Sequence, residues 1–129
     1  MLRFVWIFIG WAMVAATLYL SLLTLQMPKI DINHADKIYH FIAYAGMMIW
    51  FSQAYLAHTR WRIAGLLIAL GIAIEFIQPY TGRQFDLLDM LANSSGVLIA
   101  WWLSLKGGDI LSPYFNKSES RHHDATLQR

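Results

Sequence analysis

A set of polar side chains between Ile32 and Gly96 lies at or near the ends of three strongly apolar stretches. Its members are Asp36, Lys37, His40, Glu75, Gln78, Arg83, Asp86, Asp89 and Asn93. They provide carboxylates, an imidazole, an ammonium and a guanidinium, which together can bind an anion and transfer protons. Ionisable residues in or beside membrane helices are rare and usually face a bundle interior or a water-filled cavity. The set therefore predicts a functional site.

We expect acid and base chemistry from three of these residues, and substrate binding from the others and Tyr44. The predicted catalytic residues are His40, Glu75 and Asp89. The predicted binding residues are Asp36, Lys37, Tyr44, Gln78, Arg83, Asp86 and Asn93. In this interpretation Lys37 and Arg83 hold an anion. His40, with Glu75 or Asp89, then shuttles protons.

Metal chemistry is a further option at the same residues. A divalent cation could be held by His40, Glu75, Asp86 and Asp89. Their spacing contains no local ligand pair such as H-E-x-x-H, so we predict no metal and no cofactor. The chain has no cysteine, which excludes disulfides and thiolate chemistry.

The composition predicts an integral membrane protein. Of 129 residues, 57% are hydrophobic and only 14% are charged, which is too apolar for an ordinary small soluble domain. The lipid bilayer is therefore the expected surrounding, and the length leaves room for one compact bundle. The net charge is +2, but Lys and Arg are scattered among helix ends and a tail, which argues against a nucleic acid partner.

Four apolar stretches divide the chain, at residues 4–25, 38–57, 61–77 and 87–105. Each has roughly 17 to 22 residues, enough to cross about 30 Å of hydrocarbon at 1.5 Å per residue. The sequence thus predicts an all-α, polytopic membrane protein with a bundle of four transmembrane helices. Residues 1–108 form this domain, and the polar segment 109–129 is predicted to be a disordered cytoplasmic tail.

The distribution of Lys and Arg predicts the orientation, because their excess marks the cytoplasmic side. At one end of the predicted helices lie Arg3, Arg60, Arg62, Lys106, Lys117, Arg121 and Arg129. At the other end lie Lys29, Lys37 and Arg83. Both termini should therefore be cytoplasmic in the cell (inner or plasma) membrane, with loops 26–37 and 78–86 facing outward. The polar set would open outward with these loops.

Helical spacing places the polar side chains on one face of each helix. Asp36, His40 and Tyr44 follow one another at intervals of four residues. His40, Glu75 and Asp89 each lie about four residues inside their outer helix end, roughly 6 Å deep. We expect these three side chains to meet at one level.

Simpler explanations remain open for several of these residues. Asp36 and Asp86 could each cap the helix that follows. Arg83 could pair with Glu75, Asp86 or Asp89 in an ion-pair network that needs no substrate. The polar set could therefore be purely structural.

Small residues predict a helix contact elsewhere in the chain. Gly65, Ala69 and Ala73 recur at every fourth position, a pattern that lets membrane helices approach closely. We expect this face of the third helix to pack against a neighbour.

The order and spacing of the polar residues resemble the signature of the VanZ-like membrane proteins. The matching segments are Asp36-Lys37-Ile38-Tyr39-His40-Phe41 with Tyr44, Glu75-Phe76-Ile77-Gln78, Gly82-Arg83, and Asp86-Leu87-Leu88-Asp89 with Asn93 and Gly96. The resemblance covers about residues 28–104, and Ala100 stands where many members are expected to carry a second glycine. It implies a four-helix membrane bundle of the cell envelope. The family is named for an accessory protein of glycopeptide (teicoplanin) resistance, a property that the resemblance does not carry to this chain.

Two functions from different classes follow. In the first, an outward-facing pocket binds or processes an anionic envelope molecule, such as a lipid-linked phosphate or a glycan precursor. In the second, the protein is a noncatalytic accessory subunit that binds a membrane protein partner, and its polar set is a structural ion-pair network. Enzyme activity is left open by the sequence.

Overall fold

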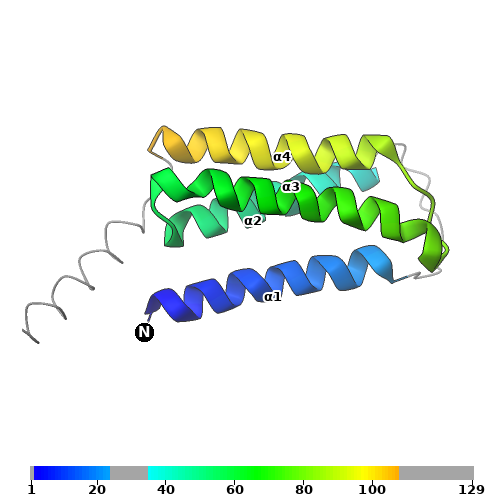
Figure 1. The fold of residues 1–129 in the computed structure, drawn as a ribbon, viewed down its shortest axis with the longest axis horizontal. Coiled ribbons are helices and arrows are strands. Elements are labelled where there is room, and N and C mark those ends of the chain that lie inside the picture. The colour runs from blue at the N-terminus through cyan, green and yellow to red at the C-terminus, as the bar shows by residue number, and fades with distance from the viewer. Residues whose placement is uncertain (1, 24–34, 108–129) are drawn as a thin grey trace, which may run out of the picture.

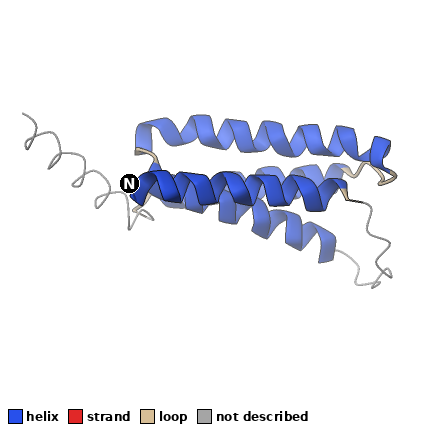
Figure 2. Cartoon of the chain, turned by 90° about the horizontal axis from the view of Figure 1, so that it is seen from below, coloured by secondary structure: helices blue, strands red, loops and turns tan. Residues whose placement is uncertain are grey.

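The computed structural model describes residues 2–23 and 35–107, which fold into an up-and-down bundle of helices (Figure 1). The long helices are α1 (Leu2–Leu22), α2 (Ala35–Ala54), α3 (Arg60–Ile77) and α4 (Leu87–Leu105). Two short 3-10 helices flank α3, namely η1 (Ala57–Thr59) and η2 (Gln78–Thr81). Consecutive long helices run in opposite directions, as both views show (Figure 2). The predicted all-α fold is confirmed for the described residues.

The helix ends agree with the predicted stretches to within a few residues. α2 begins three residues before the predicted start at residue 38, because Asp36 lies inside its first turn and not at its N-cap. A negative charge in a first turn is favourable next to the exposed N–H groups of the helix. Asp86 is the N-cap of α4, as predicted, and accepts a hydrogen bond from the Leu88 N–H. Lys29 and the tail 109–129 lie outside the described residues.

Three described segments are long and apolar enough to cross a membrane, which supports the membrane prediction. They are Arg3–Leu22, Ala57–Thr81 and Leu87–Leu105. α2 has 20 residues but is not among them, since Lys37, His40 and Gln53 make it less apolar. Four membrane spans and cytoplasmic placement of both termini therefore stay predictions.

The bundle is organised around α2, which contacts each of the other long helices. Its side chains Tyr44, Met47, Met48 and Phe51 are buried and form the middle of the apolar core. A mixed apolar and polar helix in the centre of the bundle keeps its polar face away from lipid.

Two glycines let α3 and α4 approach α2 closely. A Cβ at Gly96 would lie 2.5 Å from the Phe41 carbonyl oxygen, so α4 touches the backbone of α2 at this point. A Cβ at Gly71 would lie 3.2 Å from Cε1 of Tyr44 and 3.1 Å from Cβ of Asn93. The polar residues of α2, α3 and α4 converge because their helices pack this tightly.

Indole rings fasten α1 to α2 near the other end of the bundle. Trp6 and Trp50 stack with their ring centroids 3.8 Å apart. Each indole N–H also donates to the other residue's carbonyl oxygen, at 3.0 Å from Trp6 and 2.9 Å from Trp50. Trp6 and Trp50 therefore join α1 to α2, a contact that the sequence did not indicate.

The predicted contact face of α3 is wrong within the described chain. Gly65, Ala69 and Ala73 are all exposed. A Cβ at Gly65 would have no neighbour within 4 Å. The face of α3 that packs inward instead carries Ala64, Leu67, Gly71 and Ile74, because the polar residues Glu75 and Gln78 must also face inward and fix the rotation of the helix.

The contact at Gly96 can be tested with alanine substitutions. Gly96→Ala should destabilise the protein by about 1–3 kcal/mol, because the added methyl group would meet the α2 backbone. Gly65→Ala is the matched control and should leave stability unchanged or slightly higher, since alanine favours the helix. The measurement is the apparent Tm of purified protein in detergent. Equal Tm values for Gly96→Ala and the wild type would contradict the close α2–α4 contact.

Candidate functional site

A lysine bridge joins α2 to the start of α4. Nζ of Lys37 lies 2.6 Å from Oδ2 of Asp86 and 3.2 Å from Oδ1 of Asp89. Lys37 is in the first turn of α2, and the two carboxylates flank the first turn of α4. One ammonium therefore neutralises much of the charge of two carboxylates.

Asp86 is held from three directions. Besides the Lys37 ammonium, its side chain accepts the Leu88 N–H at 2.8 Å, while its own backbone N–H donates to Oε2 of Glu75 at 3.4 Å. The Lys37 ammonium, and next the Leu88 N–H, hold the pKa of the Asp86 carboxyl below its usual value. Glu75 is fully buried, and this hydrogen bond joins the end of α3 to the start of α4.

An arginine connects the loop before α4 to both α1 and α2. Nη2 of Arg83 lies 3.2 Å from Oδ2 of Asp36, and its Nη1 donates to the Ser21 carbonyl oxygen at 3.3 Å. Gln78 donates to the same carbonyl oxygen, also at 3.3 Å. Gly82 adopts φ +84°, which turns the chain between Gln78 and Arg83. The Ser21 carbonyl oxygen near the end of α1 is thereby bound to the polar site. The charged side chains of this site come from other parts of the chain.

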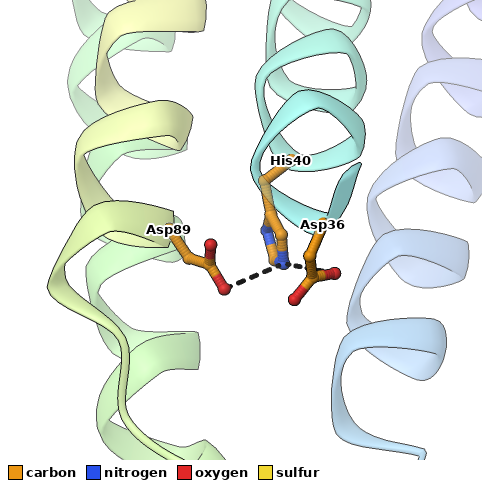
Figure 3. Close-up of side chains that lie close together, drawn as sticks. All are labelled: Asp36, His40 and Asp89. Carbon is orange, nitrogen blue, oxygen red and sulfur yellow. Dashed lines mark ion pairs between the residues drawn. The ribbon is translucent and has the colours of Figure 1, made fainter. Parts of the chain in front are cut away.

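His40 lies between two carboxylates (Figure 3). Its Nε2 is 3.9 Å from Oδ1 of Asp36 and 3.8 Å from Oδ2 of Asp89. Its Nδ1 is 3.1 Å from the amide oxygen of Asn93. That oxygen can only accept, so the contact is a hydrogen bond when Nδ1 carries a proton, and Nε2 is the ring nitrogen that lies between the carboxylates.

A cavity of about 190 Å³ lies beside this histidine. Its lining combines polar and apolar side chains from α1, α2 and the loop before α4. The lining residues are Thr17, Leu20, Ser21, Asp36, Tyr39, His40, Ala43 and Arg83. A partly charged, partly apolar recess of this kind suits a molecule with a polar headgroup and an apolar chain.

Further polar atoms lie deeper in the bundle. Oη of Tyr44, Oε1 of Glu75 and Nδ2 of Asn93 are buried and have no hydrogen-bond partner among the described residues. A buried polar group without a partner costs about 1–3 kcal/mol. Polar groups therefore continue from the cavity into the interior of the bundle. Their burial lowers the free energy of unfolding.

Comparison with known families identifies the chain. A family profile described as VanZ/LLP1 matches residues 2–110. The chain belongs to the VanZ/LLP1 family. No curated protein and no solved structure gives a significant match.

The VanZ/LLP1 match confirms the predicted resemblance and extends it to α1, which the predicted range 28–104 left out. The structure brings the predicted residues together at one end of the bundle, but not in one cavity. Asp36, His40 and Arg83 line the cavity, whereas Lys37, Glu75 and the other members of the set do not. Their catalytic and binding roles stay predictions.

Sequence reasoning missed the contribution of α1 to this VanZ/LLP1 site. Thr17, Leu20 and Ser21 line the cavity, and the Ser21 carbonyl oxygen accepts two side-chain hydrogen bonds. A backbone carbonyl carries no signal in the sequence, and no charged residue marks this part of α1. Arg60 was also missed: it is only 1% exposed and binds the Ser104 carbonyl oxygen at 2.8 Å at the opposite end of the bundle.

The Lys37–Asp86 pair predicts a pH-dependent stability. Asp86→Asn removes the charge but keeps a side chain able to cap α4. Because the folded pKa of Asp86 is lowered, the stabilisation is present above the usual carboxyl pKa of 3.8 and is lost as the pH falls through the folded value. At pH 7 we expect Asp86→Asn to lose about 0.5–1 kcal/mol, a modest figure because the pair is partly exposed.

The measurement is the apparent Tm of wild type and variant in detergent between neutral and acidic pH, and the two curves should converge at the acidic end. Asp86→Ala is the control: it should lose about a further 1 kcal/mol at every pH because it also removes the cap. A deficit of Asp86→Asn that does not change with pH would show that the ion pair is not its cause.

Proposed function

We propose that this VanZ/LLP1 protein is a four-span protein of the cell (inner or plasma) membrane whose outward-facing site binds an anionic envelope molecule. The molecule would be a lipid-linked phosphate or glycan precursor. The cavity between α1 and α2 carries this proposal, because it combines the polar side chains of Arg83, Asp36 and His40 with the apolar side chains Leu20 and Ala43.

Arg83 is the group best suited to hold the anion. Its side chain is 29% exposed, and its partner Asp36 is 56% exposed, so an incoming phosphate could take the place of this carboxylate. A guanidinium presents several N–H donors in a plane that fits phosphate oxygens. Lys37 is bound by two carboxylates, so its contribution is to hold the start of α4 in place.

His40 is the proposed proton-transfer group. With Nδ1 bound to the Asn93 amide oxygen, its Nε2 faces the cavity side and can accept a proton from a bound hydroxyl or phosphate. Asp89 lies 3.8 Å from Nε2, close enough to stabilise the imidazolium that would form. Glu75 supports this arrangement through the Asp86 N–H and from outside the cavity.

A second function is favoured by one specific observation. Both cations of the site are already paired, Lys37 with Asp86 and Asp89, and Arg83 with Asp36. Such a neutralised network could serve only to fix helix register in a noncatalytic accessory protein that binds a membrane partner. The two functions differ in what happens to anion binding when Arg83 is replaced.

The orientation in the membrane can be tested first, because the chain contains no cysteine. Single cysteines at Gln84 and at His58 lie in the loops at opposite ends of the bundle. With four spans and cytoplasmic termini, a membrane-impermeant maleimide should label the cysteine at position 84 in intact cells. It should label the one at position 58 only after the cells are opened. The reverse pattern would place the polar site on the cytoplasmic side.

Anion binding can be tested with a polyprenyl phosphate and the uncharged polyprenol of the same length. Wild-type protein in nanodiscs should bind the phosphate more tightly. Arg83→Gln should weaken phosphate binding at least about tenfold, as expected for a lost charged hydrogen bond. Arg62→Gln is the control, since Arg62 lies over the Trp61 ring at the other end of the bundle. Affinity can be read by native mass spectrometry.

The same experiment separates the two functions. If Arg83→Gln lowers the apparent Tm but phosphate and polyprenol bind equally to the wild type, the network is structural and the proposed binding function is wrong. A loss of phosphate affinity by a variant that elutes as folded protein supports the binding function.

A further inference from the structure

We propose that Asp36, His40 and Asp89 form a site for one divalent metal ion beside the cavity. The site follows from the positions of these side chains. Its role, which rests on the proposed function, is to let an anionic headgroup bind next to carboxylates.

The three candidate ligand side chains lie close together, with His40 between the two aspartates (Figure 3). Nε2 of His40, one oxygen of Asp36 and one oxygen of Asp89 all lie within 4.8 Å of one another. His40 and Asp89 are buried, while Asp36 is exposed in the first turn of α2. Packing therefore restricts the side chains of His40 and Asp89, whereas the exposed Asp36 side chain has more freedom to rotate.

The separations are too long for hydrogen bonds but close to those of shared metal ligands. Nε2 is 3.9 Å from the Asp36 oxygen and 3.8 Å from the Asp89 oxygen. With metal bonds of about 2.0–2.2 Å, two ligands of a tetrahedral ion lie about 3.4 Å apart. The two separations from Nε2 must each close by about half an ångström to reach this value. The two carboxylate oxygens, which lie within 4.8 Å of each other, must approach by up to about 1.4 Å, a movement that rotation of the exposed Asp36 side chain can supply.

Each of the three side chains is also held by its other polar atom. The amide oxygen of Asn93 binds Nδ1 of His40, Arg83 binds Oδ2 of Asp36, and Lys37 binds Oδ1 of Asp89. Protein metal sites commonly fix their ligands in this way, with an acceptor on the far nitrogen of the histidine and hydrogen bonds to the ligating carboxylates. These three anchors leave Nε2 of His40, Oδ1 of Asp36 and Oδ2 of Asp89 as the candidate ligand atoms.

The charge balance of the site favours a cation as well. The ion pairs link three aspartates, Asp36, Asp86 and Asp89, to two cations, Lys37 and Arg83. These five side chains carry an excess of one negative charge, which disfavours an anion at close range. A divalent ion would reverse the sign of this excess and leave a coordination position open toward the cavity for a phosphate oxygen.

The ligand set differs from the one that the sequence suggested. Glu75 and Asp86 do not point at this centre, because Oε2 of Glu75 accepts the Asp86 N–H and Oδ2 of Asp86 binds Lys37. Asp36 takes their place, one helical turn before His40. Asp36 and His40 are thus a ligand pair at a spacing of four residues on one helix, and Asp89 completes the set from α4.

Metal binding can be measured directly on the full-length protein in detergent after treatment with a chelator. Isothermal titration with Zn²⁺ and with Mn²⁺ should show one site per chain. All proteins carry His122→Gln and His123→Gln, so that the tail histidines cannot bind the ion. His40→Gln and Asp36→Asn should weaken binding at least about 100-fold, and Asn93→Ala about 10- to 100-fold.

A control variant separates this site from other histidines of the chain. His58→Gln alters an exposed histidine at the other end of the bundle. It should bind the ion as the unaltered protein does. Should the His40 or Asp36 variants fail to fold, the absorption spectrum of Co²⁺ bound to the protein that carries only the two tail substitutions reports whether nitrogen and oxygen atoms coordinate the ion.

The outcomes distinguish this proposal from the function on which it partly rests. Folded protein that binds no ion, or that binds it equally well without His40, overturns the metal site, and phosphate binding can still be retained. If the ion binds but polyprenyl phosphate binds equally with and without chelator, its role in anion binding is wrong. One bound ion per chain together with chelator-sensitive phosphate binding supports both parts.

Discussion

The close contact between α2 and α4 is the constraint on which the polar site depends. At Gly96 the α4 backbone touches the Phe41 carbonyl of α2, and there is no space for a side chain. This contact lies between the charged helix starts and the apolar core. It fixes the height and rotation of both helices, so that Lys37 reaches Asp89 and His40 reaches Asn93. A shift of one turn, about 5.4 Å, would separate every one of these pairs.

The central position of α2 explains how a helix with several polar groups is accommodated in an apolar bundle. Its neighbours supply a partner for each charged group in its first turns, and its later turns supply the core through Met47, Met48 and Phe51. α1 contributes no charged side chain to the described site. It closes the cavity instead with apolar groups and with the Ser21 carbonyl oxygen. The VanZ/LLP1 profile match includes α1, which agrees with the contribution of α1 to the cavity.

The same contacts account for both proposed functions. Ion pairs that hold helices in register also hold His40, Asp36 and Asp89 in fixed positions, so stability and a binding site are not separate features here. Most of these pairs lie at the end of the bundle where side chains are partly exposed. Deeper in, Tyr44, Glu75 and Asn93 retain buried polar atoms that have no hydrogen-bond partner within residues 2–23 and 35–107, a feature that packing alone does not favour.

The sequence alone determined the helical class, the four apolar stretches, the polar cluster at one end and the family. The helical class, the apolar stretches and the polar cluster follow from composition, from the length of apolar runs and from a spacing of four residues, which are local properties of a helix. The family follows from the resemblance of the motifs around Asp36, Glu75 and Asp86 and from the profile match. Only the tertiary structure decided which charges pair, that Glu75 supports α4 from outside the cavity, and that the small-residue face of α3 is exposed. Those outcomes depend on the rotation and height of each helix relative to the others, and helical spacing within one segment does not contain them.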